Sequence, residues 1–170
     1  MTDATTTTLW TRARWREQPG RMGGITLLLV LRYFFALFFT GATANKLLRG
    51  WLWSDALRGI FTERIKELDP GSFGYAFLEK FGIPYAYPVG VVVTLTEAAV
   101  MVSMWLGLAT RAGALLAIWL MVMFSIGGYY DASLIGLWAW AALFVVFPTG
   151  HWLGLDRRLH AQHPQSIWFR

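Results

Sequence analysis

Cysteine is absent from this chain of 170 residues, and its absence excludes several kinds of chemistry. Disulfide bonds, thiol relays, iron–sulfur ligation and cysteine nucleophiles all need a thiol. Histidine is scarce too: His151, His160 and His163 all lie in the last twenty residues. No two imidazoles are therefore expected to face each other across a membrane bundle, which excludes a bis-histidine haem there. His160 and His163 have a possible metal-site spacing but no nearby acid or cysteine, so we expect no metal.

Charged residues are also few, at 15% of the chain, whereas 56% of the residues are hydrophobic and 16% are aromatic. This composition is too apolar for an ordinary soluble domain. The apolar residues are gathered into four long blocks, which implies that lipid surrounds most of the chain. We therefore predict an all-α fold, an integral membrane four-helix bundle. The expected spans are residues 24–45, 84–109, 112–128 and 132–152.

The two ends of the chain, residues 1–23 and 153–170, are basic tails. With the connection between the second and third spans, they place eight Lys and Arg on one side of the membrane, against six on the other. The positive-inside rule then predicts that both termini are cytoplasmic, in the inner membrane, with the tails facing lipid headgroups and no nucleic acid as partner. The alternative is a secretory signal peptide, because Ala42-Thr43-Ala44 resembles a cleavage site; we expect the first span to be retained.

A long connection separates the first two spans, and residues 54–82 of it have amphipathic spacing. Ser54 is the expected N-cap of a helix that Asp69-Pro70-Gly71 ends. A second short helix is expected to begin near Ser72 and to bury its phenylalanines. These are Phe73, Phe77 and Phe81. The segment either lies flat on the outer face of the membrane or folds back over the bundle as a lid.

Two charges interrupt the predicted spans, Arg32 in the first and Glu97 in the second. An ionised side chain in hydrocarbon costs roughly 2.5 to 3.5 kcal/mol, so each needs a partner. We predict a buried Arg32–Glu97 ion pair, because leaving either charge alone costs more than pairing them. The pair either fixes only the helix packing or also binds or protonates a ligand.

Lys46 falls on the same helical face as Arg32, fourteen positions along the chain. Phe39 and Thr43 lie between them on that face, and Met101 adds an adaptable wall on the second span. This face suits a slot for an amphipathic ring compound. Alternatively, Lys46 extends to the outer headgroups.

Two further ion pairs are expected at the edges of the bundle. Arg111 and Asp156 are of opposite sign at matching depth on the cytoplasmic side, and we expect them to meet for structural reasons. At the outer edge, Asp131 is a possible partner of Lys46. No glycine-rich phosphate loop, nucleophile elbow or dinucleotide fingerprint is present.

Together these motifs resemble the DoxX and DoxD-like family of small four-helix membrane proteins, over roughly residues 28–159. The resemblance depends on the order and spacing of an Arg and a Lys in the first span, an acid in the second, and two glycine-containing motifs after the second and fourth spans. These are Arg32, Lys46, Glu97, Gly107-Leu108-Ala109-Thr110-Arg111 and Gly150-His151-Trp152-Leu153-Gly154-Leu155-Asp156.

The resemblance implies a place in membrane redox chemistry, as in a thiosulfate:quinone oxidoreductase. It favours a membrane subunit that binds a quinone headgroup and relies on a partner subunit for electrons. Arg32, Phe39, Thr43 and Met101 would hold the headgroup, and Glu97 or Lys46 would relay protons. The alternative is a non-catalytic accessory or anchor subunit of a larger membrane complex; a small transporter or channel is a third possibility.

Overall fold

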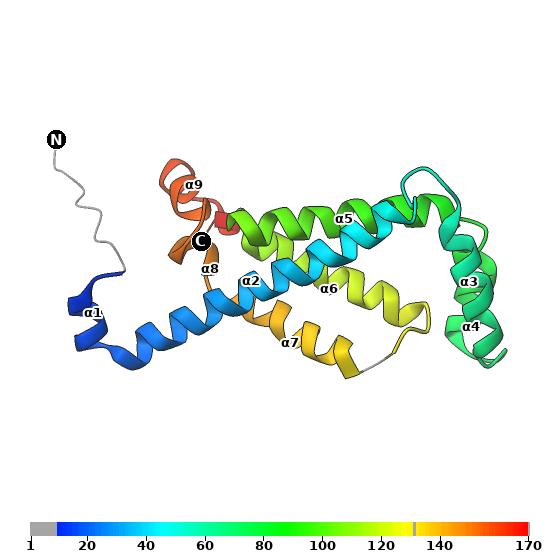
Figure 1. Ribbon diagram of the computed structural model, residues 1–170, viewed down its shortest axis with the longest axis horizontal. Helices are drawn as coiled ribbons and strands as arrows, with labels where there is room; N and C mark the ends of the chain where they lie inside the picture. Colours follow the sequence, from blue (N-terminus) through cyan, green and yellow to red (C-terminus); the bar gives the residue numbers. More distant parts are fainter. Residues whose placement is uncertain (1–9, 131, 170) are drawn as a thin grey trace.

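The computed structural model describes residues 10–130 and 132–169, and all the secondary structure in this part of the chain is helical. This confirms the all-α prediction. Four long helices lie side by side and form the body of the molecule (Figure 1). They are α2 (Pro19–Leu48), α5 (Ala86–Leu106), α6 (Thr110–Ile126) and α7 (Ala132–Val146).

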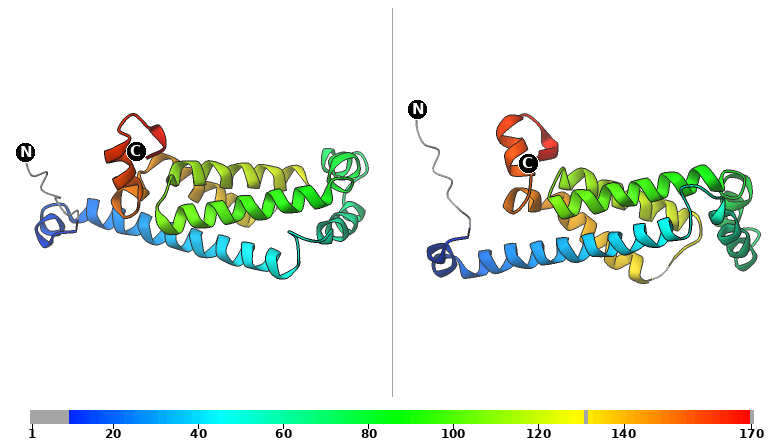
Figure 2. Two further views of the ribbon diagram at one scale, coloured as in Figure 1. Left: turned by 90° about the horizontal axis from the view of Figure 1, so that it is seen from above. Right: turned by 45° about the horizontal axis from the view of Figure 1, so that its top comes forward.

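The shorter elements gather at the two ends of this bundle (Figures 1 and 2). At one end lie α1 (Arg12–Glu17), α8 (Thr149–Trp152), α9 (Asp156–Gln162) and η2 (Ile167–Phe169). At the other end lie α3 (Ala56–Glu67), α4 (Phe73–Phe77) and η1 (Leu78–Gly82). α5 packs against both α2 and α6, and α6 also packs against α7.

Two of the long helices, α2 and α5, are long and apolar enough to cross a membrane. They have 30 and 21 residues, whereas α6 and α7 are apolar but shorter, with 17 and 15 residues. The segment predicted as a single span over residues 132–152 is divided: α7 ends at Val146 and α8 begins at Thr149. Pro148 explains the break, because a proline disfavours helical geometry in the residue before it and lacks an N–H group.

The connection between α2 and α5 contains the helices that its amphipathic spacing predicts, but the first of them begins differently from the prediction. The residue before α3 is Asp55, and the Ser54 hydroxyl donates instead to the carbonyl oxygen of Gly50 at 2.8 Å. Ser72 caps α4 as expected, accepting a hydrogen bond from the backbone N–H of Tyr75 at 3.2 Å.

The prediction that Phe73 and Phe81 are buried is wrong, because they are 71% and 46% exposed. The buried large hydrophobic side chains of this segment are Leu57, Phe61 and Leu78. The short helices therefore pack through α3 and the start of η1, and leave aromatic rings on their outer side.

The α3–α4 segment packs against the connection between α6 and α7. Arg64 on α3 donates a hydrogen bond to the carbonyl oxygen of Gly128, and its guanidinium carbon lies 5.1 Å from the ring centre of Tyr129. Gly128 has a positive φ of 81°, and a Cβ there would lie 2.9 Å from Leu68 Cδ2. This packing across the end of the bundle is compatible with both alternatives drawn from the sequence.

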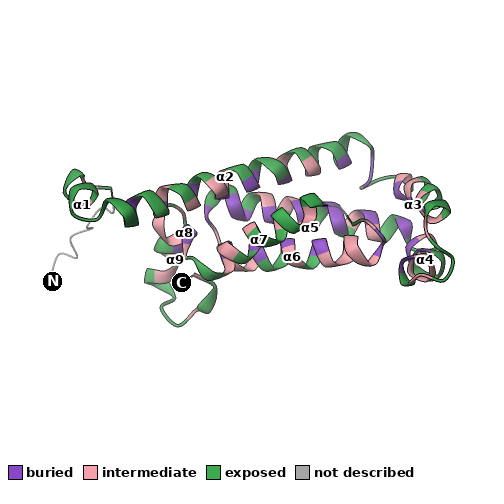
Figure 3. Ribbon diagram, turned by 90° about the horizontal axis from the view of Figure 1, so that it is seen from below, coloured by how far each residue is buried: buried purple, intermediate pink, exposed green. Residues whose placement is uncertain are grey.

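The core lies between the four long helices and alternates large with small side chains. Phe35 packs on Phe39 and on Phe144 of α7, with ring centres 4.9 and 5.3 Å apart. α5 and α6 approach so closely that a Cβ at Gly113 would lie 2.2 Å from Ser103 Oγ. The outer faces of the helices remain exposed (Figure 3).

Candidate functional site

The two charged side chains expected to pair, Arg32 and Glu97, bind different partners. The guanidinium of Arg32 is completely buried and donates to the carbonyl oxygens of Thr149 at 2.7 Å and Leu153 at 2.6 Å. Thr149 is the first residue of α8 and Leu153 is its C-cap, and the Thr149 carbonyl oxygen also accepts the backbone N–H of Leu153 at 3.2 Å. The predicted Arg32–Glu97 pair is therefore wrong: Arg32 caps a short helix that the sequence did not predict.

Glu97 instead pairs with Lys46, whose ammonium nitrogen lies 2.7 Å from Glu97 Oε1. The lysine and glutamate side chains are only 10% and 3% exposed. Each Cα–Cβ bond in a helix tilts toward the N-terminus of that helix. Because α2 and α5 run in opposite directions, the side chains of Lys46 and Glu97 lean toward each other, whereas those of Arg32 and Glu97 lean apart. The prediction from sequence compared depth and reach but left out this tilt.

Unsatisfied polar atoms surround the Lys46–Glu97 pair. Glu97 Oε2 is buried and has no hydrogen-bond partner, and neither has the hydroxyl of Thr43, which precedes Lys46 by one turn on the same face. Trp51 covers the lysine, with its ring centre 5.0 Å from Nζ, and its own buried indole N–H is also unpaired. The pair thus has an acceptor and two donors beside it that the protein does not use.

The structure places only some of the other residues predicted for this slot next to the Lys46–Glu97 pair. Phe39 is buried in the core against Phe35, and Met101 is half-buried on α5, one turn after Glu97. Arg32 belongs to the opposite end of the bundle, with α8. Thr43, Lys46 and Glu97 remain together as the candidate site, and Trp51 joins them. Sequence reasoning missed Trp51, although its place five residues after Lys46, just past the end of α2, was a usable signal.

The predicted pair of Asp156 with Arg111 is wrong. Asp156 instead caps the N-terminus of α6. Its carboxylate accepts hydrogen bonds from the backbone N–H groups of Ala109 and Thr110 and from the Thr110 hydroxyl, the last at 2.9 Å. The N–H groups at the start of a helix are unpaired and carry partial positive charge, so they attract a carboxylate. Arg111 donates instead to the carbonyl oxygen of Ile167 at 3.5 Å.

The glycine-containing motifs build this same junction. Gly107 ends α5 with a φ of 60°, and its carbonyl oxygen accepts from the N–H of Asp156 at 2.9 Å. A Cβ at Gly154 would lie 2.6 Å from Gly107 Cα, and one at Gly150 would lie 2.1 Å from Asp156 Oδ2. These motifs therefore bring the chain after α7 into contact with the α5–α6 turn. Their role in this protein is structural.

Two other titratable groups outside the long helices have shifted pKa values. Burial raises the pKa of the Tyr129 phenol above its usual 10.0, an effect that Arg64 opposes and Glu67 reinforces. Burial, and then the neighbouring His160, lower the pKa of His151 below 6.5, and Asp156 partly offsets them. Asp131, the other expected partner of Lys46, lies outside the described residues.

Among residues 10–130 and 132–169, no group of three or more His, Asp or Glu side chains is arranged to hold a metal ion. Comparisons with protein-family models, curated proteins and solved structures find no significant match to the chain.

Proposed function

We propose that the protein is an integral membrane protein in which α2, α5, α6 and α7 cross the bilayer. The length and composition of α2 and α5 support this. So do the outer faces of the long helices, where Leu27, Phe34, Leu95 and Ile135 are each more than half exposed (Figure 3). Such extensive apolar surface is stable in lipid, and helices satisfy their own backbone groups there.

The count of basic residues supports an orientation with α1 and α9 on the cytoplasmic side of the inner membrane and α3 on the outer side. Because the chain has no cysteine, single substitutions can test this. Glu63→Cys on α3 and Gln165→Cys near η2 are both at exposed positions. In spheroplasts, an impermeant thiol reagent should label the first variant and should label the second only after permeabilisation. The reverse pattern would contradict the orientation, and equal labelling of both would contradict the bundle topology.

Within this bundle, we propose that the Lys46–Glu97 pair binds the headgroup of a quinone and exchanges protons with it, in a DoxX- and DoxD-like redox system. The observation that best supports this is the unpaired, buried Glu97 Oε2 of the ion pair, together with the unpaired, buried Thr43 hydroxyl one turn before Lys46 on α2. Burying a polar atom without a partner destabilises a fold, so each such atom calls for an explanation, and a bound ligand is one.

The chemistry of these groups fits a quinone headgroup, which presents carbonyl oxygens on a flat ring. The Lys46 ammonium, the Thr43 hydroxyl and the Trp51 indole N–H are donors for such oxygens. Glu97 Oε2 is placed to hold a proton or release it. A quinone bound there supplies the redox chemistry, and a partner subunit supplies the electrons, because the chain has no cysteine for a thiol or iron–sulfur centre.

Quinone bound to the purified protein tests this proposal. Extraction and chromatography should find quinone with the wild type and with the control Glu79→Gln, whose side chain is exposed. The double variant Lys46→Met/Glu97→Leu removes both charges and should fold but lose the quinone. Equal quinone in the double variant would contradict the proposed site.

A non-catalytic accessory or anchor subunit is the second candidate. A groove between α5 and α6 favours it, because small residues such as Ala98, Ala99, Ala112 and Gly113 line it. Small residues let another transmembrane helix approach closely. Copurification from native membranes followed by mass spectrometry separates the two functions: quinone found only when partner subunits are present would favour the accessory function.

A further inference from the structure

Two imidazoles lie against each other where α8 meets α9. The ring centres of His151 and His160 are 5.0 Å apart, with an angle of 66° between the ring planes. Nε2 of His151 and Nδ1 of His160 are both buried, and neither has a hydrogen-bond partner. Two potential ligand atoms from different helices are thus shielded from solvent and left unsatisfied.

We propose that His151 Nε2 and His160 Nδ1 together bind one divalent transition-metal ion, of which Zn²⁺ is the representative. Imidazole nitrogens suit Zn²⁺, Cu²⁺ and Ni²⁺. A tetrahedral zinc ion lies about 2.0–2.1 Å from each nitrogen, which places two bound imidazole rings with their centres about 5 Å apart. The ring separation matches this value, and one ion would satisfy both unpaired nitrogens.

The carboxylate of Asp156 is occupied in capping α6, so the two imidazoles are the protein ligands of this site. With two protein ligands, the site binds metal more weakly than a structural zinc site with four. Metal binding would link α8 to α9. Arg32 already binds the carbonyl oxygens of Thr149 and Leu153, in α8 and at its C-cap.

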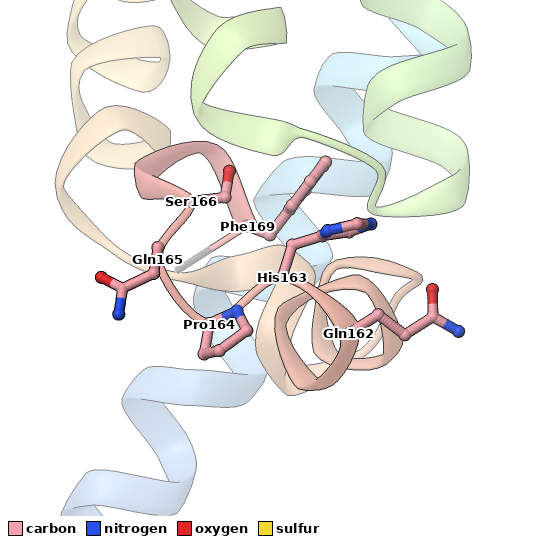
Figure 4. Close-up of a pocket in the computed structure, with 6 residues that line it drawn as sticks. All are labelled: Gln162, His163, Pro164, Gln165, Ser166 and Phe169. Carbon is pink, nitrogen blue, oxygen red and sulfur yellow. The ribbon is translucent and has the colours of Figure 1, made fainter.

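The third histidine contacts a different ring and provides a matched control. His163 packs on the ring of Phe169, with ring centres 6.3 Å apart. Both side chains line a hollow formed by the end of α9 and η2 (Figure 4). The sequence spacing had suggested His160 with His163; the geometry selects His160 with His151.

Isothermal titration with Zn²⁺ tests the site, using the full chain in detergent without a polyhistidine tag. We expect one equivalent of zinc to bind the wild type. His151→Ala and His160→Ala should each weaken binding at least about tenfold, since even the loss of an outer-shell partner has an effect of that size. His163→Ala should bind as the wild type does. Zinc should also raise the Tm of the wild type and of His163→Ala, but not of the other two variants.

Three results would overturn the proposal. One is the absence of zinc uptake by the wild type, and another is equal uptake by all three variants. The third is a loss in His163→Ala with retention in His151→Ala, which would show that His160 and His163 bind zinc from α9 alone. Circular dichroism and gel filtration check that each variant is folded. If His151→Ala fails this check, the contrast between His160→Ala and His163→Ala decides the question.

Discussion

Lys46 donates to Glu97 at 2.7 Å from near the C-terminal end of α2, reaching a carboxylate in the middle of α5. This contact is possible because the two helices are antiparallel and each side chain leans toward the N-terminus of its own helix. The result is a nearly solvent-free ion pair that links the first two long helices at the end of the bundle where α3 packs.

The first prediction concerns the stability of this pair. Glu97→Leu and Lys46→Met should each lower the free energy of unfolding by about 3–5 kcal/mol, because each leaves a buried charge without its partner. The double variant should be close to the wild type, since it removes both charges and keeps apolar volume. Unfolding in mixed detergent, followed by circular dichroism, measures all three variants.

A double variant as unstable as the sum of the single variants would show that the two charges are not coupled. The matched control is Lys66→Met/Glu63→Leu, which removes an exposed ion pair within α3. Its effect should stay below about 1 kcal/mol, because exposed pairs contribute little.

The second prediction concerns Arg32. Arg32→Met should lower the free energy of unfolding by about 3 kcal/mol, because the carbonyl oxygens of Thr149 and Leu153 lose a charged donor. Arg32→Lys should recover part of this loss, since an ammonium group lacks the planar fork that reaches both oxygens. Arg49→Met, at an exposed position, should change stability by no more than about 0.5 kcal/mol. Equal effects at positions 32 and 49 would contradict the capping role.

The sequence predicted the helical class and the approximate position of each long helix, because long apolar blocks bounded by glycine and proline leave little choice of element. It also predicted that Arg32 and Glu97 are buried charged residues, which is confirmed, and it singled out Lys46 and Asp156 without predicting that they are buried as well. It did not predict their partners. Both Arg32 and Asp156 bind backbone groups at helix ends. The positions of these ends depend on the break at Pro148 and the turn at Gly107, which the sequence reasoning did not place.

The pairing of Lys46 with Glu97 could have been predicted from the sequence if side-chain direction had been considered. The depths of two residues in a bilayer can be found by counting, but the direction of each side chain also depends on which way the helix runs. The packing of α3 on the α6–α7 connection was beyond such reasoning, because it depends on Arg64 and Leu68 meeting a bare backbone at Gly128.

The third prediction concerns Tyr129, whose hydroxyl is buried without a partner. Because the pKa of the phenol is raised in the folded protein, the neutral form is favoured there. The folded state then holds its proton at a pH where the unfolded state has lost it, so stability falls as the pH rises above about 10. Tyr129→Phe should be at least as stable as the wild type at pH 8 and should lose less stability by about pH 11. Unfolding at both pH values measures the difference, and parallel losses in the two proteins would contradict it.

The fourth prediction compares two glycines that differ in their surroundings. A Cβ at Gly154 would lie 2.6 Å from Gly107 Cα, and the neighbour is backbone that cannot rotate away. Gly154→Ala should therefore lower the free energy of unfolding by about 3 kcal/mol through overpacking. Gly136 lies within α7, and a Cβ there would meet no atom within 4 Å, so Gly136→Ala should raise stability by about 0.5–1 kcal/mol through helix propensity. Thermal unfolding in one detergent compares the pair. If both substitutions were neutral, the close contact between the α5–α6 turn and the chain after α8 would not exist, and the structural role given to the glycine motifs would fail with it.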